Sequence, residues 1–218
     1  MSKVKRNASK IQNIINELEK YNDVPQIELN YINPFTLLIA VLLSAQATDK
    51  HVNKVTAPIF EDIKRPQDIL ELGLENLTKA VSSVNYYKTK AKNIYALSQK
   101  LMDEFGGVVP KTREELMTLP GIGRKSANAI LNTLYDMPYI AVDTHVFRVT
   151  QRLGICKGKT PEVIEQQLEE IIPDQYKTRI SDWFVLHGRY ICKAQKPNCE
   201  ECHLREWCDY YTALKTGK

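Results

Sequence analysis

The chain has 218 residues, of which 43% are hydrophobic and 26% are charged, and its net charge is +4. This balance is ordinary for a soluble globular protein with enough apolar material for one large domain or two small ones. The mild positive charge permits a polyanionic partner but is too weak to indicate one by itself. The longest apolar stretch, FTLLIAVLLSA at residues 35–45, has 11 residues. That length excludes a membrane span and predicts a buried helix.

The N-terminal residues 1–20 lack the apolar core of a signal peptide. We therefore expect a cytoplasmic protein with no membrane partner. In that reducing compartment the five cysteines, an odd number, are not expected to form disulfides.

Nearly every segment has the apolar spacing of a short helix. Glycines at 106 and 107 end the longest of them, and no stretch alternates as a strand would. The sequence therefore predicts an all-α fold, with a possible domain boundary at residues 136–141. The predicted helices include residues 11–18, 35–45, 52–59, 88–105, 124–134, 161–172 and 177–191.

A glycine hairpin, LPGIGRKSAN at residues 119–128, precedes the helix predicted at residue 124. Gly121 and Gly123 allow a tight turn whose backbone N–H groups, together with the next helix terminus, can bind a phosphate of DNA without reading sequence. Lys125 lies in the first helical turn, where the helix dipole disfavours a cation. Its amine is therefore either another phosphate contact or a nucleophile able to form a Schiff base.

Asp143 in AVDTHVFRV is placed to cap the helix that follows it. A carboxylate near an amine nucleophile could also stabilise positive charge and assist proton transfer. Arg148 and Arg152, one helical turn apart, are expected to pair with acids or phosphates.

Four cysteines near the C-terminus have the spacing C-x6-C-x2-C-x5-C: Cys192, Cys199, Cys202 and Cys208. Thiolates so close together need a metal centre to neutralise them, and their spacing alone fits either a structural zinc or a 4Fe–4S cluster. Lys193 and Lys196 on the first loop either bind phosphates or are simply solvated. Cys156 stands apart and is expected to be a small buried hydrophobe.

These motifs together resemble the bacterial endonuclease III family of helix-hairpin-helix DNA glycosylases. The matching features are the hairpin, VDTH with Asp143 18 residues after Lys125, the cysteine tail, and LLSAQATD at residues 42–49. The likeness covers essentially the whole chain. It implies two helical lobes flanking a DNA-binding cleft: a six-helix barrel with the helix-hairpin-helix motif at residues 27–137, and an iron–sulfur lobe from residues 1–26 and 138–218.

The resemblance also implies base-excision DNA repair. Lys125 would attack C1′ of a flipped nucleotide with help from Asp143, an oxidised pyrimidine would leave, and β-elimination through the Schiff base would nick the strand 3′ to the abasic site. The implied partner is double-stranded DNA with oxidised pyrimidines or abasic sites. The protein is expected to act as a monomer at a bacterial nucleoid. The implied cofactor is a 4Fe–4S cluster on the four tail cysteines. The implied DNA contacts are Gln46, Tyr86, Gly121, Gly123, Arg124, His145, Lys193 and Lys196.

One loop departs from the family pattern. Asn85 and Tyr86 occupy places where the family commonly has a glycine and an apolar residue. Asn tolerates a left-handed backbone, and Tyr86 is expected to act as a wedge that stacks in DNA. Two alternatives are an adenine-mismatch glycosylase, which lacks a lysine at the position of Lys125, and a non-catalytic DNA-binding module with a zinc-stapled tail.

Overall fold

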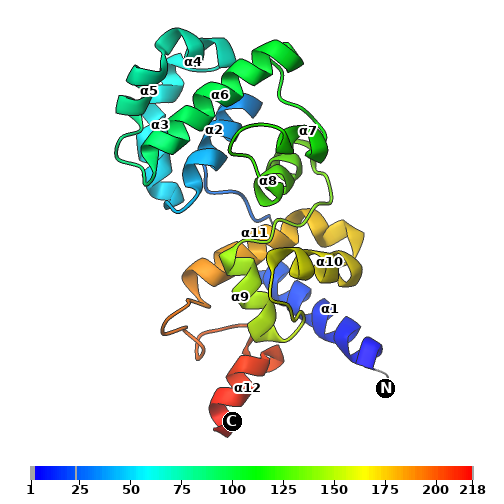
Figure 1. Ribbon diagram of the computed structural model, residues 1–218. Helices are drawn as coiled ribbons and strands as arrows, with labels where there is room; N and C mark the ends of the chain where they lie inside the picture. Colours follow the sequence, from blue (N-terminus) through cyan, green and yellow to red (C-terminus); the bar gives the residue numbers. More distant parts are fainter. Residues whose placement is uncertain (1–2, 23, 218) are drawn as a thin grey trace. The chain divides into compact units, whose positions relative to one another are not determined.

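The computed structural model describes residues 3–22 and 24–217, with side chains described from residue 9 onward. The all-α prediction is confirmed, since the described residues form helices and no strand (Figure 1). Two compact units divide the chain: residues 27–135, and residues 1–26 with 136–218. Residues 1, 2, 23 and 218 of the second unit lie outside the described residues. None of the helices in the described part of the chain has the length and apolar content that a membrane span needs.

The unit of residues 27–135 is one continuous stretch of chain. Its helices pack mainly as α4 and α5 against α6, α2 against α3, and α7 and α2 against α8. The predicted helix at 88–105 is observed as α6, one residue longer. The elements are α2 (Pro34–Ser44), α3 (Asp49–Asp62), α4 (Pro66–Leu72), α5 (Leu74–Ala80), α6 (Tyr87–Phe105), α7 (Arg113–Met117) and α8 (Arg124–Tyr135).

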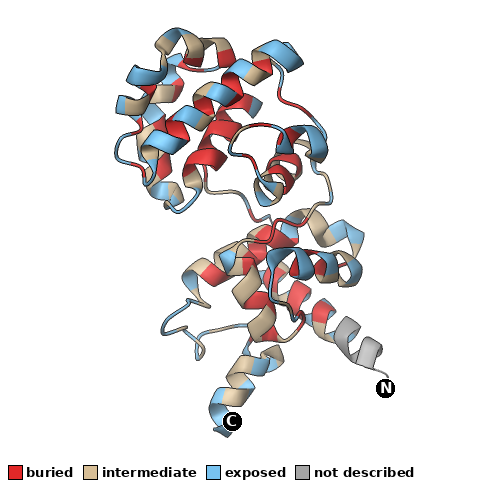
Figure 2. Cartoon of the chain, in the orientation of Figure 1, coloured by how far each residue is buried: buried red, intermediate tan, exposed pale blue. Residues whose placement is uncertain are grey.

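The apolar run predicted as a core helix forms α2, in which residues 35–43 are all buried (Figure 2). Asn33 begins the helix because its side-chain oxygen accepts from the backbone N–H of Thr36, while the Thr36 hydroxyl accepts from the backbone N–H of Asn33. This reciprocal capping box, followed by a proline at the first helical position, fixes where the helix starts. A helix buried on all sides is the natural centre of its unit.

The other unit combines both ends of the chain. Its main packing joins α9 with α11, and α9 also contacts α10 and α12. The helix predicted at 177–191 starts three residues earlier than expected, at Asp174 behind Pro173. The elements are α1 (Lys3–Tyr21), α9 (Thr144–Leu153), α10 (Pro161–Ile171), α11 (Asp174–Tyr190), the 3-10 helix η1 (Arg205–Trp207) and α12 (Asp209–Thr216).

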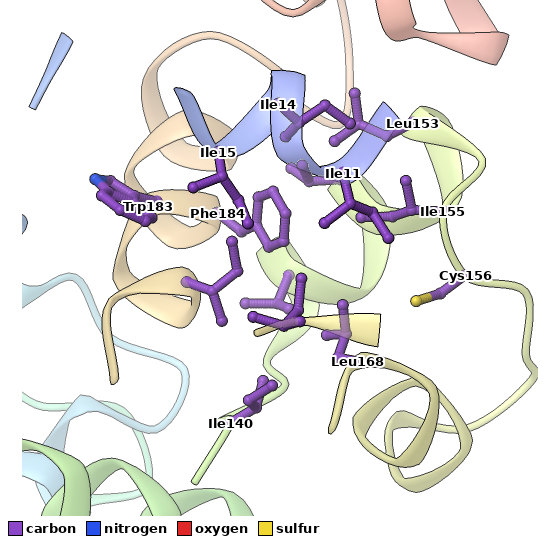
Figure 3. Close-up of a cluster of buried hydrophobic side chains, with 14 of the residues drawn as sticks. Ile11, Ile14, Ile15, Ile140, Leu153, Ile155, Cys156, Leu168, Trp183 and Phe184 are labelled. Carbon is purple, nitrogen blue, oxygen red and sulfur yellow. The ribbon is translucent and has the colours of Figure 1, made fainter. Parts of the chain in front are cut away.

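The apolar stripe of α1 fills the core of this second unit. Its residues Ile11, Ile14, Ile15 and Leu18 are buried. Figure 3 shows the three isoleucines among side chains of the later helices, including Phe184. The Trp183 indole N–H donates to the Asn22 carbonyl at 2.6 Å. Cys156 belongs to the same core, where burial raises the pKa of its thiol to about 12. The prediction that this cysteine is a buried hydrophobe is confirmed.

Candidate active site and cysteine pocket

The hairpin between α7 and α8 is anchored by its apolar residues. Leu119 and Ile122 are buried, and the Ile122 N–H donates to the Leu119 carbonyl at 3.1 Å. Gly121 and Gly123 are exposed at the same turn. The buried side chains of Leu119 and Ile122 therefore fix the turn, while the backbone of its two glycines stays exposed.

Only glycine fits at position 121. Its φ of +82° lies in the left-handed region, and a Cβ there would lie 2.9 Å from side-chain atoms of both Asn93 and Leu42. At Gly123 a Cβ would meet nothing within 4 Å. The structure thus separates the pair: Gly121 is needed for the turn itself, whereas Gly123 leaves free space in front of α8.

Lys125 is exposed in the first turn of α8, directly after half-buried Arg124. The first backbone N–H groups of any helix lack helical acceptors, so they and the hairpin amides form a natural anion site. The structure thereby brings Gly121, Gly123, Arg124 and Lys125 together on one turn, as the sequence predicts. The Lys125 side chain is therefore exposed next to a turn whose backbone N–H groups could bind an anion.

Asp143 caps α9, as predicted. Its Oδ1 atom accepts from the backbone N–H groups of His145 and Val146, each at 2.8 Å. Both bonds use Oδ1, which leaves Oδ2 for another partner. The segment before it is fixed by the buried residues 140–142 and by a hydrogen bond from the Ala141 N–H to the Ser181 hydroxyl at 2.9 Å. The half-buried carboxylate is therefore rigidly placed.

His145, an expected DNA contact, lies beside Arg148. The Arg148 Nη2 and the His145 Nδ1 are 3.2 Å apart, and because a guanidinium only donates, Nδ1 is the acceptor in this contact. Gly188 of α11 packs against the ring: a Cβ there would lie 2.8 Å from the His145 Cβ. Arg148 also donates to the carbonyls of Gly188 and Cys192, at 2.8 and 3.0 Å.

Gln46 and Tyr86 lie on two exposed loops of the unit of residues 27–135. Both have left-handed backbones, with φ of +56° and +57°. Asn85, which could tolerate a left-handed backbone, does not adopt one, whereas its neighbour Tyr86 does. Asn85 uses its side chain: Nδ2 donates to the Gln46 carbonyl at 2.9 Å.

The four tail cysteines line a single pocket. Within it lie Cys192, Cys199, Cys202 and Cys208, with Arg152 and His187 among the other lining residues. Short loops shape the pocket, since the Asn198 N–H donates to the Ile191 carbonyl and the Cys202 N–H to the Cys199 carbonyl. In the described residues no three His, Cys, Asp or Glu side chains are arranged to hold a single metal ion.

Three of the thiols in this pocket, those of Cys199, Cys202 and Cys208, have raised pKa values. Burial raises the pKa of Cys202 to about 11, and the neighbouring cysteines push it the same way. Burial also raises the pKa of Cys199 and of Cys208. Four thiolates can form here only with a cationic partner, so the donor set fits an electron-poor metal centre that binds sulfur.

Arg152 holds the first cysteine loop. Its guanidinium donates to the carbonyls of Lys193 and Ala194 at 2.7 and 3.0 Å, and lies 3.4 Å from the Cys192 sulfur. Arg148 and Arg152, predicted to pair with acids or phosphates, both bind backbone carbonyls around the pocket, and their contact with phosphates stays a prediction. Their spacing of one helical turn in the sequence indicated that the two arginines lie on the same face of the helix. The ends of the loop leave Lys193 and Lys196 exposed.

Comparison with known proteins places the chain among DNA repair proteins. Residues 39–174 match the family model of the HhH-GPD superfamily base excision DNA repair proteins. Endonuclease III of Rickettsia conorii is 49% identical over 205 residues, covering 94% of this chain and 98% of that protein. Endonuclease III of Escherichia coli K12 is 44% identical over 204 residues, covering 94% and 97%.

Two solved structures extend the likeness to three dimensions. A trapped covalent endonuclease III–DNA intermediate, an estranged-adenine complex, superposes with a TM-score of 0.91 at 40% identity, covering 99% of this chain and 100% of that one. A non-covalent endonuclease III–DNA complex gives 0.91 at 41% identity, covering both chains fully. The fold and hairpin are those of a helix-hairpin-helix base-excision repair enzyme. Within that class, the chain belongs to the endonuclease III family.

Proposed function

We propose that this protein is a bifunctional DNA glycosylase and abasic-site lyase that removes oxidised pyrimidines from double-stranded DNA. The observation that supports it most directly is the exposed amine of Lys125 on the hairpin turn, in a chain similar over 99% of its length to a trapped covalent endonuclease III–DNA intermediate. Because the substrate is genomic DNA, we expect the protein to act at a bacterial nucleoid.

In the proposed reaction the Lys125 amine attacks C1′ of a nucleotide flipped out of the helix. The new N–C1′ bond replaces the glycosidic bond, and the oxidised pyrimidine leaves with the bonding electron pair and takes up a proton. Ring opening gives a Schiff base, which makes the C2′ proton acidic. Loss of that proton and cleavage of the C3′–O bond then nick the strand 3′ to the abasic site.

Asp143 is proposed to assist this attack. Its Oδ1 atom is occupied by the cap of α9, so Oδ2 is the oxygen available to stabilise the cationic sugar or to accept a proton from the amine. A capping carboxylate has little freedom to rotate away, which suits electrostatic stabilisation of a short-lived charge.

We assign the two proposed domains, and the DNA contacts in each, to the two units of the chain. The unit of residues 27–135 corresponds to the proposed barrel domain, with its hairpin gripping phosphates and Gln46 and Tyr86 entering the duplex. The unit built from both chain ends corresponds to the proposed iron–sulfur domain. Its remaining proposed DNA contacts are His145, Lys193 and Lys196.

The proposed cofactor is a 4Fe–4S cluster on the four tail cysteines. A zinc ion would draw four sulfurs to within about 2.3 Å of one point, whereas a four-iron cluster takes one thiolate at each iron. Membership of the endonuclease III family favours the cluster over zinc, and the four cysteines that line one pocket match its four thiolates. When bound, the cluster neutralises the thiolates and orders the loop that bears Lys193 and Lys196.

The cofactor proposal predicts a coloured protein. The purified chain is expected to be yellow-brown, to absorb in the visible range and to contain about four iron atoms per chain. Replacement Cys202→Ser is expected to remove most of that absorbance, because a hydroxyl is a poor substitute for a thiolate at iron. Cys156→Ser is the matched control and should keep the colour, since Cys156 lies in the hydrophobic core and does not line the pocket. A colourless protein with one zinc per chain would contradict the cluster.

The test of the whole proposal is strand nicking on duplexes with a single lesion. We expect cleavage at thymine glycol and at a preformed abasic site, and borohydride should convert the intermediate into a covalent protein–DNA adduct visible on a denaturing gel. An undamaged duplex of the same sequence should stay intact. Absence of both nicking and trapping on every lesion would overturn the assignment.

A further inference from the structure

The loops that bear Gln46 and Tyr86 are unusual in their backbone. Gln46 follows the end of α2, and Tyr86 is the residue before α6. Both are non-glycine residues held in the left-handed region, and both side chains are exposed. Left-handed non-glycine residues persist only where neighbouring groups fix them, and they gather at functional sites.

Hydrogen bonds from the second loop and from α6 hold the first loop in place. The Asn85 Nδ2 donates to the Gln46 carbonyl at 2.9 Å. The buried Lys90 ammonium donates to the carbonyls of Leu43 and Ala45, at 2.8 and 2.6 Å. These carbonyls belong to the last turn of α2 and to the turn after it, where a helix leaves its acceptors without partners.

A further contact ties the second loop to the body of the unit. The His51 Nε2 lies 3.0 Å from the Ser83 carbonyl, so α3 is tied to the turn that precedes Asn85. The Asn85 amide therefore links the two loops directly, while Lys90 of α6 holds the first loop and His51 of α3 lies against the second.

We infer that Asn85 is a positioning residue that locks the Gln46 turn, so that Gln46 and Tyr86 enter DNA as one rigid unit. The inference rests on the proposed function. Where the family pattern has glycine, this chain has a side-chain amide that reaches across to the other loop. The hydrogen bond from this amide makes the loop more rigid than a glycine would. We expect this rigidity to favour the step in which the lesion is flipped out of the duplex and its partner base is unstacked.

The role is tested with a duplex that has a stable tetrahydrofuran abasic analogue opposite 2-aminopurine. Insertion of the loop tips unstacks 2-aminopurine and raises its fluorescence. Asn85→Ala is expected to reduce the fluorescence rise at saturating protein and to slow excision of thymine glycol by about tenfold, the effect of one lost hydrogen bond. Cleavage of a preformed abasic site should fall by less than about twofold, because a site without a base costs less to extrude.

Asn85→Asp keeps the shape and removes the donor, and should behave as Asn85→Ala does. The matched control is Asn76→Ala, which removes a comparable bond, from the Asn76 amide to the Leu72 carbonyl at 3.0 Å, on the exposed face of α5. It should leave fluorescence and excision at wild-type values. Melting temperatures of all variants show that the fold is retained.

The Gln46→Gly variant distinguishes a positioning role of Asn85 from a direct contact of Asn85 with DNA. In Gln46→Gly the left-handed turn forms without support, because glycine adopts it freely. Adding Asn85→Ala to this background should change excision by less than about twofold. The inference is overturned if Asn85→Ala matches the wild type, or if its tenfold effect persists unchanged in the Gln46→Gly protein. Failure of the proposed function is a separate result: the wild type itself would then cleave neither substrate.

Discussion

Replacement of Lys125 by glutamine is expected to abolish the covalent adduct that borohydride forms between the wild-type protein and abasic DNA. Glutamine has similar length but an amide nitrogen that is not a nucleophile, so no Schiff base can form. Loss of the nucleophile should reduce both trapping and strand nicking by at least about a thousandfold. Quantified denaturing gels over a range of reaction times measure both.

Binding separates this effect from a simple loss of affinity. Lys125→Gln should bind a duplex containing the tetrahydrofuran analogue within about tenfold of the wild type, because one phosphate contact among several is lost at most. Lys79→Gln is the control: Lys79 is an exposed lysine of the same unit, whose ammonium pairs with Glu75 on the surface of α5. An adduct that persists in Lys125→Gln would assign the chemistry to another amine and leave Lys125 as a phosphate contact.

Asp143→Asn is expected to lower single-turnover excision by about a hundredfold or more, with nearly unchanged DNA binding. The reason is that asparagine keeps the hydrogen bonds to the start of α9 but lacks the negative charge. Because Asn and Asp are about equal as helix caps, thermal stability should stay close to that of the wild type.

Asp143→Ala completes the comparison. It loses the cap as well as the charge, and should be less stable by about 1 kcal/mol in addition to the loss of turnover. Calorimetry and single-turnover kinetics on the two variants thus report the two roles of one carboxylate separately. Near-normal turnover in Asp143→Asn would leave the structural cap as its only role.

Periodicity and local turn chemistry account for most of what could be foreseen. The apolar run at residues 35–45 became the buried helix α2, and the spacing through residues 88–105 became α6. Short elements such as α4 and α5 escaped prediction because seven residues span too few turns to display a period. They share Gly73, which ends the first and begins the second.

At the candidate site, the features that depend on neighbouring residues could be predicted from the sequence. The left-handed turn at Gly121 and the cap at Asp143 follow from residues within a few positions of each other. The bonds that fix the Gln46 loop could not be foreseen, since Asn85 and Lys90 lie 39 to 47 residues away from their acceptors. A lysine also gives no sign in a sequence that it will be buried. The catalytic and cofactor assignments themselves stay predictions.

The division of the chain has a consequence for its biosynthesis. Residues 27–135 are contiguous and emerge from the ribosome as one block, which can collapse around α2 while translation continues. Helix α1 is made earlier, but the core residues that cover its apolar stripe, such as Leu168 and Phe184, come from far downstream. Its bond from Lys10 to Asp209 likewise spans 199 positions. The apolar stripe of α1 is therefore exposed in the nascent chain for longer than any other core element, and it is the segment a ribosome-bound chaperone would encounter first.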